Sequence, residues 1–591
     1  MLRQSLIWTA LLCSLVPAAN AQFTQQGPIL FGSGGIYPSG QGYAVAVSAD
    51  GNTAIVGGYN DNNLAGAAWV FTRTGDVWSE QGSKLVGSGA VGPAQQGISV
   101  ALSADGNTAL VGGFADNNSA GAAWVFTRSN GVWSQQGNKL VGSDGTASSE
   151  QGLSVALSAD GNTALIGYPS GTPTGAAWIF ARSSGVWTQQ SKLSPNVNRS
   201  AYYSFCCVAL SADGTTALLG GLTGDVFSLV PTGWVFTHSG NTWIQQGGEL
   251  IASDAILPTG NQSALPPVAL SADGNTALLG WLADNQFLGA AWVFTRSGGT
   301  WSQQAKLVGS GWIADRYGFV YQGYSVALSG DGNTALVGGP DDSGDEGAVW
   351  VFRRAGNVWN QSGGKLVGLG PNIQGVSVAL STDGYTALSG AGGSGAFVFA
   401  APVPAPLGVI SLWANTEVPL GKSVKLVVTL AKPAPPAGLT VDLTSSDPSK
   451  VTVTPSVFIP GGRTSPTVEP QVNGLNLGTV SIHATALGYT PDTQSVHVTA
   501  SLAFARCCVT VISATPLSAV LTLSSPAPSG GLTVNLASDN PTVAKVPATI
   551  IFPAGTTSVN VPITGVAAGA TLVHASSPPD LADVSVKVAV R

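Results

Sequence analysis

Ser-Val-Ala-Leu-Ser-Ala-Asp-Gly-Asn-Thr-Ala-Leu-Val-Gly-Gly, residues 99–113, is the stretch of sequence that decides the fold. Apolar and β-branched residues alternate on both sides of Asp105-Gly106, a dipeptide that favours a tight hairpin turn because glycine tolerates positive φ. We therefore expect two antiparallel strands, residues 98–104 and 107–113, joined by this turn.

Two more strands are predicted to follow within the same unit. A polar loop at residues 114–120 leads to Gly-Ala-Ala-Trp-Val-Phe-Thr-Arg at residues 121–128. Ser129-Asn130-Gly131 is a second tight turn, and residues 132–141 then form a fourth strand. Four short antiparallel strands in one repeating unit are typical of a β-propeller blade. We name the four strands A to D in chain order.

The unit is repeated along the first two thirds of the chain. Its Asp-Gly (A–B) turn recurs at intervals of 52 to 60 residues, at Asp50, Asp105, Asp160, Asp213, Asp273, Asp331 and Asp383. Fixed spacing of this kind is the sequence signature of a repeat architecture. Seven copies predict seven blades.

Tryptophan recurs at two positions of the repeat. Strand C carries Trp69, Trp124, Trp178, Trp234, Trp292 and Trp350, and strand D begins with Trp78, Trp133, Trp187, Trp243, Trp301 and Trp359. A ladder of exposed rings could bind sugars. Regular recurrence instead favours packing between blades, because burial of one tryptophan is worth roughly 5 kcal/mol as an upper bound.

The seventh copy lacks its fourth strand. Residues 395–401 match strand C, but no Trp-x-Gln-Gln strand follows them. The missing sequence lies at the other end of the chain, where residues 23–33 match residues 133–143. We predict that residues 22–34 pair with residues 395–401 and close the ring, which removes two sheet edges that would otherwise aggregate.

A proline-rich linker at residues 402–408 separates the predicted propeller, residues 22–401, from two segments that resemble each other, residues 409–500 and 501–591. Pro436-Ala437-Gly438-Leu439-Thr440-Val441 in the first parallels Ser529-Gly530-Gly531-Leu532-Thr533-Val534 in the second. Short alternating strands between Pro and Gly turns predict two immunoglobulin-like β-sandwiches. The fold class is therefore all-β.

Residues 1–21 are typical of an export signal. Arg3 precedes an apolar run, and Ala19-Asn20-Ala21 is a cleavage sequence, so the mature chain is expected to begin at Gln22. A retained anchor is the alternative, but the apolar run is too short to span a bilayer. No later segment has spanning length. We expect an extracellular or cell-surface protein that is a monomer.

Composition excludes some partners. Only 9% of residues are charged, the net charge is −7, and no basic cluster exists. Removal of residues 1–21 takes away Arg3 and leaves a charge of 22 − 30 = −8. This argues against nucleic acid and anionic membranes as partners.

The repeat resembles the FG-GAP family of integrin α-subunit propellers, and most closely its bacterial secreted branch. The Phe-Gly of that family appears here as Gln-Gly, at Gln41, Gln96, Gln151, Gln322 and Gln374, and copies four and five lose it. The resemblance implies a propeller that binds a ligand or partner more often than it catalyses a reaction. The resemblance also implies calcium binding in the A–B turn. However, Ca²⁺ requires six to eight oxygen ligands, and the Ser-Ala-Asp-Gly-Asn turn offers one carboxylate. We expect no cofactor and interpret Asp105 and its equivalents as turn formers.

Four cysteines follow the export signal, as the adjacent pairs Cys206-Cys207 and Cys507-Cys508. They lack the spacing of a disulfide framework or a metal site. Our default interpretation is small buried apolar residues. A bond between neighbours is the alternative.

Catalytic motifs are absent from the sequence. None of the four histidines lies in a metal-ligand or nucleophile motif, and His238 occupies the strand C position of Arg128. A pair of carboxylates could act as in a glycosidase, with Asp341, Asp342, Asp345 and Glu346 as candidates. A solvated loop that satisfies its own turns explains these acids better.

Topology indicates the binding face. The A–B and C–D turns are tight and share one face, whereas the longer B–C and D–A loops share the other, where functional side chains are expected. The most divergent loops are residues 309–322 and 196–205. From these and from a tryptophan that replaces a repeat glycine, we predict the binding residues Trp312, Asp315, Arg316, Tyr317, Phe319, Tyr321, Tyr202, Tyr203 and Trp281.

Three functions remain open from the sequence. The first is a non-enzymatic binding or adhesion protein for an extracellular protein or glycan, with the sandwiches as spacers. The second is a carbohydrate-active enzyme, a glycosidase or lyase. The third is a structural component of an envelope or matrix, in which the aromatic rings merely cover the backbone of their own loops.

Overall fold

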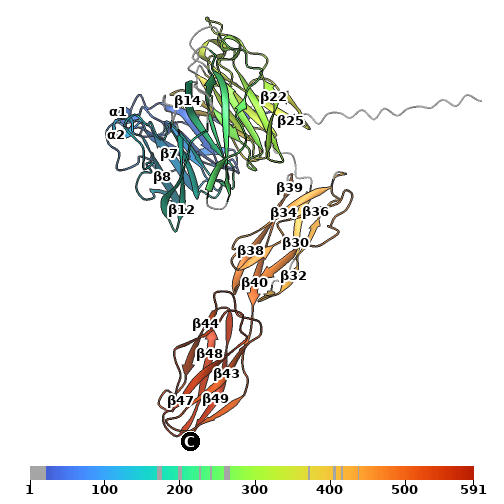
Figure 1. Ribbon diagram of the computed structural model, residues 1–591. Helices are drawn as coiled ribbons and strands as arrows, with labels where there is room; N and C mark the ends of the chain where they lie inside the picture. Colours follow the sequence, from blue (N-terminus) through green and yellow to red (C-terminus); the bar gives the residue numbers. More distant parts are fainter. Residues whose placement is uncertain are drawn as a thin grey trace, which may run out of the picture. The chain divides into compact units, whose positions relative to one another are not determined.

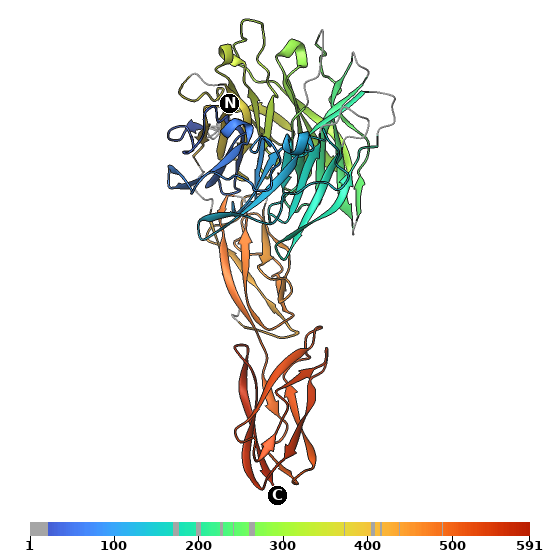
Figure 2. The ribbon, with the colours of Figure 1, turned by 90° about the vertical axis from the view of Figure 1, so that its left-hand side faces the viewer.

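The computed structural model describes residues 22–168, 176–196, 202–224, 228–239, 242–258, 266–370, 373–402, 408–413, 417–436, 438–486 and 488–591. The predicted export signal lies outside these residues. The chain divides into two compact units, Met1–Val403 and Pro404–Arg591, which Figures 1 and 2 show from two sides. In the described part of the chain, no helix combines the length and apolar character needed to cross a membrane.

Seven antiparallel sheets make up the first unit, one for each sequence repeat, and this confirms the predicted propeller (Figure 1). Six of them follow the chain: β2 (Gln41–Val47), β3 (Thr53–Gly58), β4 (Ala67–Thr74), β5 (Val77–Glu80); β6 (Ser99–Leu102), β7 (Thr108–Gly113), β8 (Ala122–Ser129), β9 (Val132–Gln135); β10 (Ser154–Leu157), β11 (Thr163–Tyr168), β12 (Ala176–Ser183), β13 (Val186–Leu193); β14 (Tyr202–Leu210), β15 (Thr216–Gly224), β16 (Val230–Ser239), β17 (Thr242–Gln245) with β18 (Leu250–Ile251); β19 (Val268–Leu270), β20 (Thr276–Trp281), β21 (Ala290–Ser297), β22 (Thr300–Leu307); β23 (Ser325–Leu328), β24 (Thr334–Gly339), β25 (Ala348–Ala355), β26 (Val358–Gln361).

The seventh sheet is completed by a strand from the N-terminal part of the chain, as predicted. Its order is β1 (Thr24–Gln25), β29 (Ala396–Ala400), β28 (Thr386–Ala391) and β27 (Gln374–Leu380). Thr24 pairs with Ala400, and Leu30 forms an isolated bridge with Ala396. Phe23 and Leu30 are buried, so this strand contributes apolar contacts as well as backbone pairing.

A ring of backbone hydrogen bonds shows that the blades close on themselves. In every blade the residue before the turn aspartate donates its N–H to the carbonyl oxygen of the equivalent residue in the next blade, over 2.8 to 3.1 Å. The ring runs Ala49, Ala104, Ala159, Ala212, Ala272, Gly330, Thr382 and back to Ala49. Such a cycle forms only if seven blades surround one axis.

A second ring of hydrogen bonds links the outer strands. A backbone N–H that follows strand D of each blade donates to the first Gln or Glu side chain of strand D in the next blade, over 2.6 to 3.0 Å. The pairs are Ser33–Glu80, Ser88–Gln135, Ser143–Gln189, Asn196–Gln245, Ser253–Gln303, Ser310–Gln361 and Leu369–Gln25. The last pair joins residues 344 positions apart and seals the ring at the N-terminal strand.

The two sets of tryptophans have different roles. All six strand C tryptophans are at most 1% exposed and pack in the clusters between blades, as predicted. The strand D tryptophans are only half-buried. Trp133 Nε1 donates to Gln81 Oε1 of the preceding blade (3.1 Å), and Arg128 Nη1 donates to the same oxygen (2.9 Å) with its guanidinium over the Trp133 ring. This second set joins blades through a polar clamp.

The Gln-Gly step has a structural cause. Gln96 is 1% exposed; its Oε1 accepts from Gly87 N–H (2.5 Å) and its Nε2 donates to Gly87 O (3.0 Å). Gly97 has φ +84°, and a Cβ there would lie 2.2 Å from the carbonyl oxygen of Ala67 in the neighbouring blade. The glutamine of this step therefore binds the start of strand A to the end of the previous strand D. Only glycine fits at the position after the glutamine.

The second unit consists of two sandwiches with the same strand order. Each sandwich contains a five-stranded sheet of the same order: β31-β40-β38-β34-β36 in the first sandwich and β42-β49-β48-β44-β46 in the second. In both sheets the first strand listed is parallel to its neighbour. The strands are β30 (Gly408–Trp413), β31 (Glu417–Pro419), β32 (Ser423–Lys425), β33 (Val427–Leu430), β34 (Leu439–Ser445), β35 (Val451–Val453), β36 (Ser456–Ile459), β37 (Gln471–Gly474), β38 (Gly478–Thr485), β39 (Tyr489–Thr490), β40 (Asp492–Thr499), β41 (Leu502–Phe504), β42 (Cys508–Val511), β43 (Pro516–Leu523), β44 (Leu532–Ser538), β45 (Ala544–Lys545), β46 (Thr549–Phe552), β47 (Ser558–Gly565), β48 (Gly569–Ser577) and β49 (Leu581–Val590).

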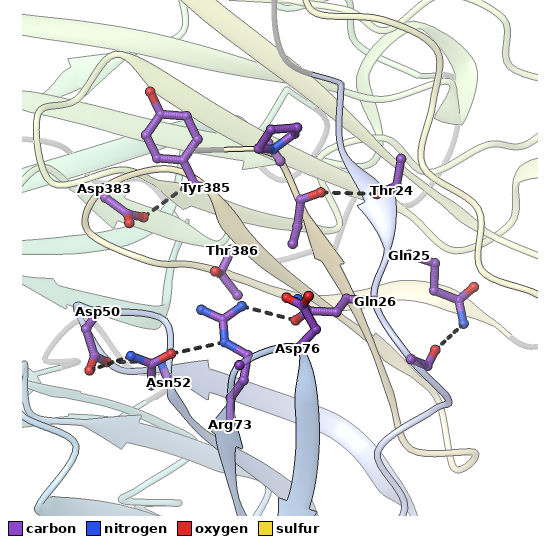
Figure 3. A pocket seen from close by; sticks show the side chains of 15 residues that line it. Thr24, Gln25, Gln26, Asp50, Asn52, Arg73, Asp76, Asp383, Tyr385 and Thr386 are labelled. Atoms are coloured by element: carbon purple, nitrogen blue, oxygen red, sulfur yellow. Dashed lines mark hydrogen bonds between the residues drawn. The ribbon is translucent and has the colours of Figure 1, made fainter. Parts of the chain in front are cut away.

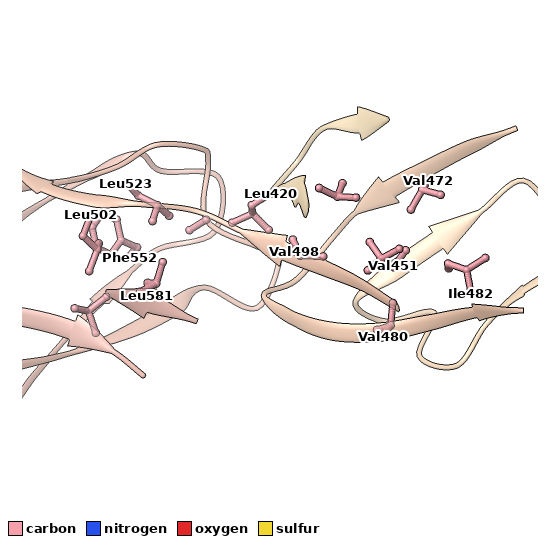
Figure 4. Close-up of a cluster of buried hydrophobic side chains, with 14 of the residues drawn as sticks. Leu420, Val451, Val472, Val480, Ile482, Val498, Leu502, Leu523, Phe552 and Leu581 are labelled. Carbon is pink, nitrogen blue, oxygen red and sulfur yellow. The ribbon is translucent and has the colours of Figure 1, made fainter. Parts of the chain in front are cut away.

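Buried apolar side chains of the two sandwiches form one continuous cluster, part of which Figure 4 shows. It contains Leu420 and Val498 of the first half together with Leu502 and Leu523 of the second. Alternate residues of a strand point inward. In β40, Val496 and Val498 are therefore buried in this cluster, whereas His497 between them is partly exposed.

The cysteines differ from our default interpretation. Cys507 and Cys508 are exposed and free, and Cys207 is disulfide-bonded, so none of these three is a small buried apolar residue. Cys206 and Cys207 lie where the pairing of β14 with β15 shifts by one residue. The side chain of Cys206 lies outside the described residues, so a bond between these two neighbours stays a prediction.

Candidate functional site

The B–C and D–A loops lie together, as the topology predicted. The loop expected at residues 114–120 contains a short helical turn, α2 (Asp116–Ser119), and three other blades have equivalents, α1 (Asp61–Leu64), α3 (Asp284–Phe287) and α4 (Asp342–Asp345). Each turn begins with a buried aspartate that accepts a backbone N–H from the preceding D–A loop and pairs with a lysine of its own blade: Ile36–Asp61–Lys84, Val91–Asp116–Lys139, Ile256–Asp284–Lys306 and Ile313–Asp342–Lys365.

In the sixth blade this arrangement holds the long loop of residues 309–322. Ile313 N–H donates to Asp342 Oδ1 (2.8 Å), and Ser343 N–H donates back to Ile313 O (2.6 Å). The two ends of the loop are joined because Gln322 bonds both backbone groups of Gly309. The loop is thus fixed at its middle and at its ends, which suits a preformed binding surface.

Aromatic side chains gather on this loop. The rings of Phe319 and Tyr321 are stacked with centroids 5.4 Å apart, and Phe287 of α3 meets both edge-on at 5.1 and 5.9 Å. Tyr317 lies 6.1 Å from Phe319 and beneath the guanidinium of Arg316 at 4.7 Å. Four of the predicted binding residues, Arg316, Tyr317, Phe319 and Tyr321, are therefore close to one another.

The exposed aromatic residues of the loop are Trp312, 39% exposed, and Tyr317, 64% exposed. Phe319 and Tyr321 are half-buried, and Phe319 lies beside the ring of Tyr317. A ring that is both exposed and held by neighbouring rings can bind a flat apolar surface with little loss of side-chain entropy.

Three carboxylates meet beside the rings. Ligand oxygens of Asp315, Asp341 and Asp345 all lie within 4.8 Å of one another. Asp315 Oδ1 accepts from the backbone N–H of Tyr317 (2.8 Å) and Phe319 (2.7 Å), which orders the loop. Burial, together with repulsion from Asp345 and Asp315, raises the pKa of Asp341 to about 6.

The expectation of a solvated acidic loop is therefore wrong for two of its four members. Asp342 is fully buried in the ion pair with Lys365, and Asp341 is half-buried. Asp345 and Glu346 are exposed, as expected. The position before α4 holds asparagine or alanine in the blades of Asn60 and Ala115, so Asp341 adds a carboxylate that the turn does not require.

Trp281 is not a binding residue. It is 0% exposed at the end of β20 and packs in a cluster with Leu250 and Trp292. Tyr202 and Tyr203 belong to β14, where their backbones pair with Gly224 and Thr223, so they lie in a strand and not in the loop that we predicted. Their side chains and residues 197–201 lie outside the described residues.

A group of tyrosines near the propeller axis escaped the sequence analysis. Tyr43 and Tyr59 of blade one meet edge-on at 4.6 Å, and the Tyr43 hydroxyl is hydrogen-bonded to that of Tyr324 in blade six. Burial, followed by the interaction with Tyr324, raises the pKa of Tyr43. Burial also raises the pKa of Tyr324, and the charge of Asp341 contributes. One signal for this group was present in the sequence: among the copies that have the Gln-Gly step, only copies one and six have a tyrosine directly after it.

A separate pocket of about 750 Å³ lies on the tight-turn face, where blade seven meets blade one (Figure 3). In blade seven, strand C is β29 and strand D is β1, which lie far apart in the sequence. No C–D turn therefore joins them, and the pocket occupies the place where the other blades have this turn. Arg73 Nε donates to Asn52, and its Nη1 and Trp78 Nε1 both donate to Gln26 Oε1. The polar side chains of the pocket thus bond to each other, which indicates a seam and not an open recognition site.

Comparisons with known proteins do not assign a family. No family model matches the chain, and no curated protein does. Among solved structures, a periplasmic gluconolactonase of Pseudomonas aeruginosa aligns at 17% identity over 76% of this chain and 99% of its own, with a TM-score of 0.38. Domains 4 and 5 of the S-layer protein SbsC align at 21% identity over 25% of this chain and 75% of theirs, with a TM-score of 0.14.

The D0-D1 domain of intimin aligns at 14% identity over 31% of this chain and 96% of its own, with a TM-score of 0.13. These scores are too low to carry an argument about function. The strand pairing and the two hydrogen-bond rings define the class instead: an all-β protein with a closed seven-bladed propeller followed by β-sandwiches.

The carboxylate cluster predicts a pH dependence. Because the pKa of Asp341 is raised in the folded protein, the folded state loses stability as pH rises from about 4, the ordinary range of aspartate, through 6. Asp341→Asn removes this loss. We expect the melting temperatures of the two proteins to agree near pH 4 and the variant to be the more stable above pH 6, measured by thermal unfolding from pH 4 to 8. A difference that is constant over this range would contradict the prediction.

Proposed function

We propose that this chain is an exported, non-enzymatic binding protein whose propeller recognises a glycan through the loop of residues 309–322. The propeller is then a diverged FG-GAP-type repeat domain, and the sandwiches act as spacers at the cell surface or outside the cell. One observation carries the proposal: two exposed aromatic rings and several hydrogen-bonding side chains share one loop that is fixed at its middle and at its ends.

The chemistry of the loop suits a hydroxyl-rich ligand. Trp312 and Tyr317 offer flat apolar faces for the C–H faces of a sugar ring. Asp315, Asp341 and Asp345 can accept hydrogen bonds from hydroxyl groups, and bonds to charged acceptors are the stronger ones. Arg316 supplies donors beside them. A protein partner would need a basic surface to supply enough hydrogen-bond donors for these three carboxylates.

Binding is tested with the mature chain, residues 22–591, on a glycan array and then by titration of the glycans that bind. The variant Trp312→Ala/Tyr317→Ala is expected to lose at least about tenfold in affinity, because loss of two stacked rings removes over 1.4 kcal/mol. Its melting temperature should match that of the parent, since both rings are exposed.

Trp413→Ala is the matched control, because Trp413 is 72% exposed but lies in the first sandwich. This variant should bind as the parent does. Absence of glycan binding, or equal binding by the loop variant, would overturn the proposal. Binding to a deglycosylated matrix protein through the same two rings would replace the glycan with a protein as the ligand.

A second candidate, a glycosidase or lyase, is favoured by one observation. Asp341 has its pKa raised to about 6 beside two other carboxylates, and an acid and a base of unequal pKa are what such reactions use. Turnover of a bound glycan by the parent protein, abolished in Asp341→Asn, would establish this candidate over the first.

A further inference from the structure

Cys507 and Cys508 form a pair of accessible thiols on the second sandwich. Their Sγ atoms are 3.2 Å apart, both side chains are exposed, and both cysteines are free. Cys507 lies in a bend, and Cys508 begins β42, whose pairing with β49 starts at Lys587. A disulfide requires sulfurs about 2 Å apart, so closure needs an approach of only about 1 Å at the end of a strand.

The fold does not require sulfur at these positions. Val511 pairs with Val590 in the second sandwich as Val418 pairs with Val498 in the first. Three and four residues before Val418 the sequence has Asn415 and Ala414, where the second sandwich has Cys508 and Cys507. Neither thiol fills a core position, because both are exposed. The pair is therefore open to a role in thiol chemistry.

We propose that Cys507 and Cys508 form a redox-active dithiol that a low-molecular-weight disulfide converts reversibly into a bond between adjacent residues. One thiolate attacks a sulfur of the oxidant, which forms a mixed disulfide and releases one thiol. The second cysteine then attacks the protein sulfur of that mixed disulfide and releases the second thiol. The protein loses two hydrogens and the oxidant is reduced to two thiols, so atoms and electrons balance.

Digestion with trypsin isolates the pair. Cleavage after Arg506 and Lys545 gives the peptide of residues 507–545, which contains no other cysteine, lysine or arginine. The mature protein is incubated in glutathione buffers from fully reduced to fully oxidised, alkylated with N-ethylmaleimide and analysed by mass spectrometry. We expect two labels under reducing conditions and, under oxidising ones, an unlabelled peptide lighter by two hydrogens. Addition of excess reductant should restore both labels.

Single variants separate this behaviour from that of ordinary exposed thiols. Cys507→Ser and Cys508→Ser should each retain one glutathione, since no neighbour displaces it, and should fold as the parent does. Phenylarsine oxide, which bridges two adjacent thiols, should protect the reduced parent from alkylation and leave both variants unprotected. Two glutathiones on the parent peptide, two labels after oxidation, or a link between two chains would each overturn the proposal.

Discussion

A chain that begins at residue 35, and so lacks residues 22–34, should not form the closed propeller. The deletion removes β1, its bridge to Ala396 and the buried side chains of Phe23 and Leu30, and it opens the outer edge of β29. It also breaks the outer hydrogen-bond ring at Gln25 and Ser33. Exposed edges pair with other chains, so we expect aggregation and loss of cooperative unfolding, measured by size-exclusion chromatography and calorimetry.

A synthetic peptide of residues 22–34 offers a direct test of the cause. Added in excess during refolding, it should restore a monomeric propeller with cooperative unfolding, because the missing strand binds only the closed state. Within the intact chain, Phe23→Ala should cost about 3 kcal/mol, whereas Thr24→Ala, at an exposed position, should change stability by less than about 0.5 kcal/mol. A truncated chain that unfolds as the parent does would show that closure does not depend on this strand.

The architecture of the propeller could be predicted because each signal was repeated. Seven Asp-Gly turns gave the number of blades, and the match of residues 23–33 to residues 133–143 gave the closing strand. The strand D tryptophans also pack against the clusters between blades, as the repetition predicted, but they are only partly buried. Trp133 stays partly exposed because its N–H and Arg128 both donate to the Gln81 oxygen at the surface.

The candidate site could be predicted only in part because departures from a repeat have two causes. The residues of the 309–322 loop depart because the loop reaches the surface, and the structure brings four of them together. Trp281 departs because it fills space in the core of a blade that has no Gln-Gly step. The contact of Tyr43 with Tyr324 joins blades one and six and depends on closure of the ring, so the tyrosine after Gln-Gly in these two copies does not by itself reveal it.

Asp342→Ala is expected to have the second-largest effect, on both stability and ligand binding. Asp342 is 0% exposed, pairs with Lys365 and accepts the N–H of Ile313 in the middle of the binding loop. Removal of one partner of a buried ion pair costs about 3 kcal/mol or more. The Ile313 N–H also loses its acceptor, so the loop loses its fixed position and the glycan affinity should fall at least about tenfold, as for a site that must be reordered on binding.

Asp116→Ala provides the matched control for this effect. In blade two, Asp116 is 1% exposed, pairs with Lys139 and accepts the N–H of Val91, so its surroundings repeat those of Asp342 away from the aromatic loop. Both variants should lose similar stability in chemical denaturation, and only Asp342→Ala should lose affinity under conditions where both are folded. Equal losses of affinity in the two variants would mean that binding follows global stability. Among the described side chains, Asp342 alone fixes the middle of the 309–322 loop through a buried charge. Unchanged affinity in Asp342→Ala would therefore show that the ligand does not bind to this loop.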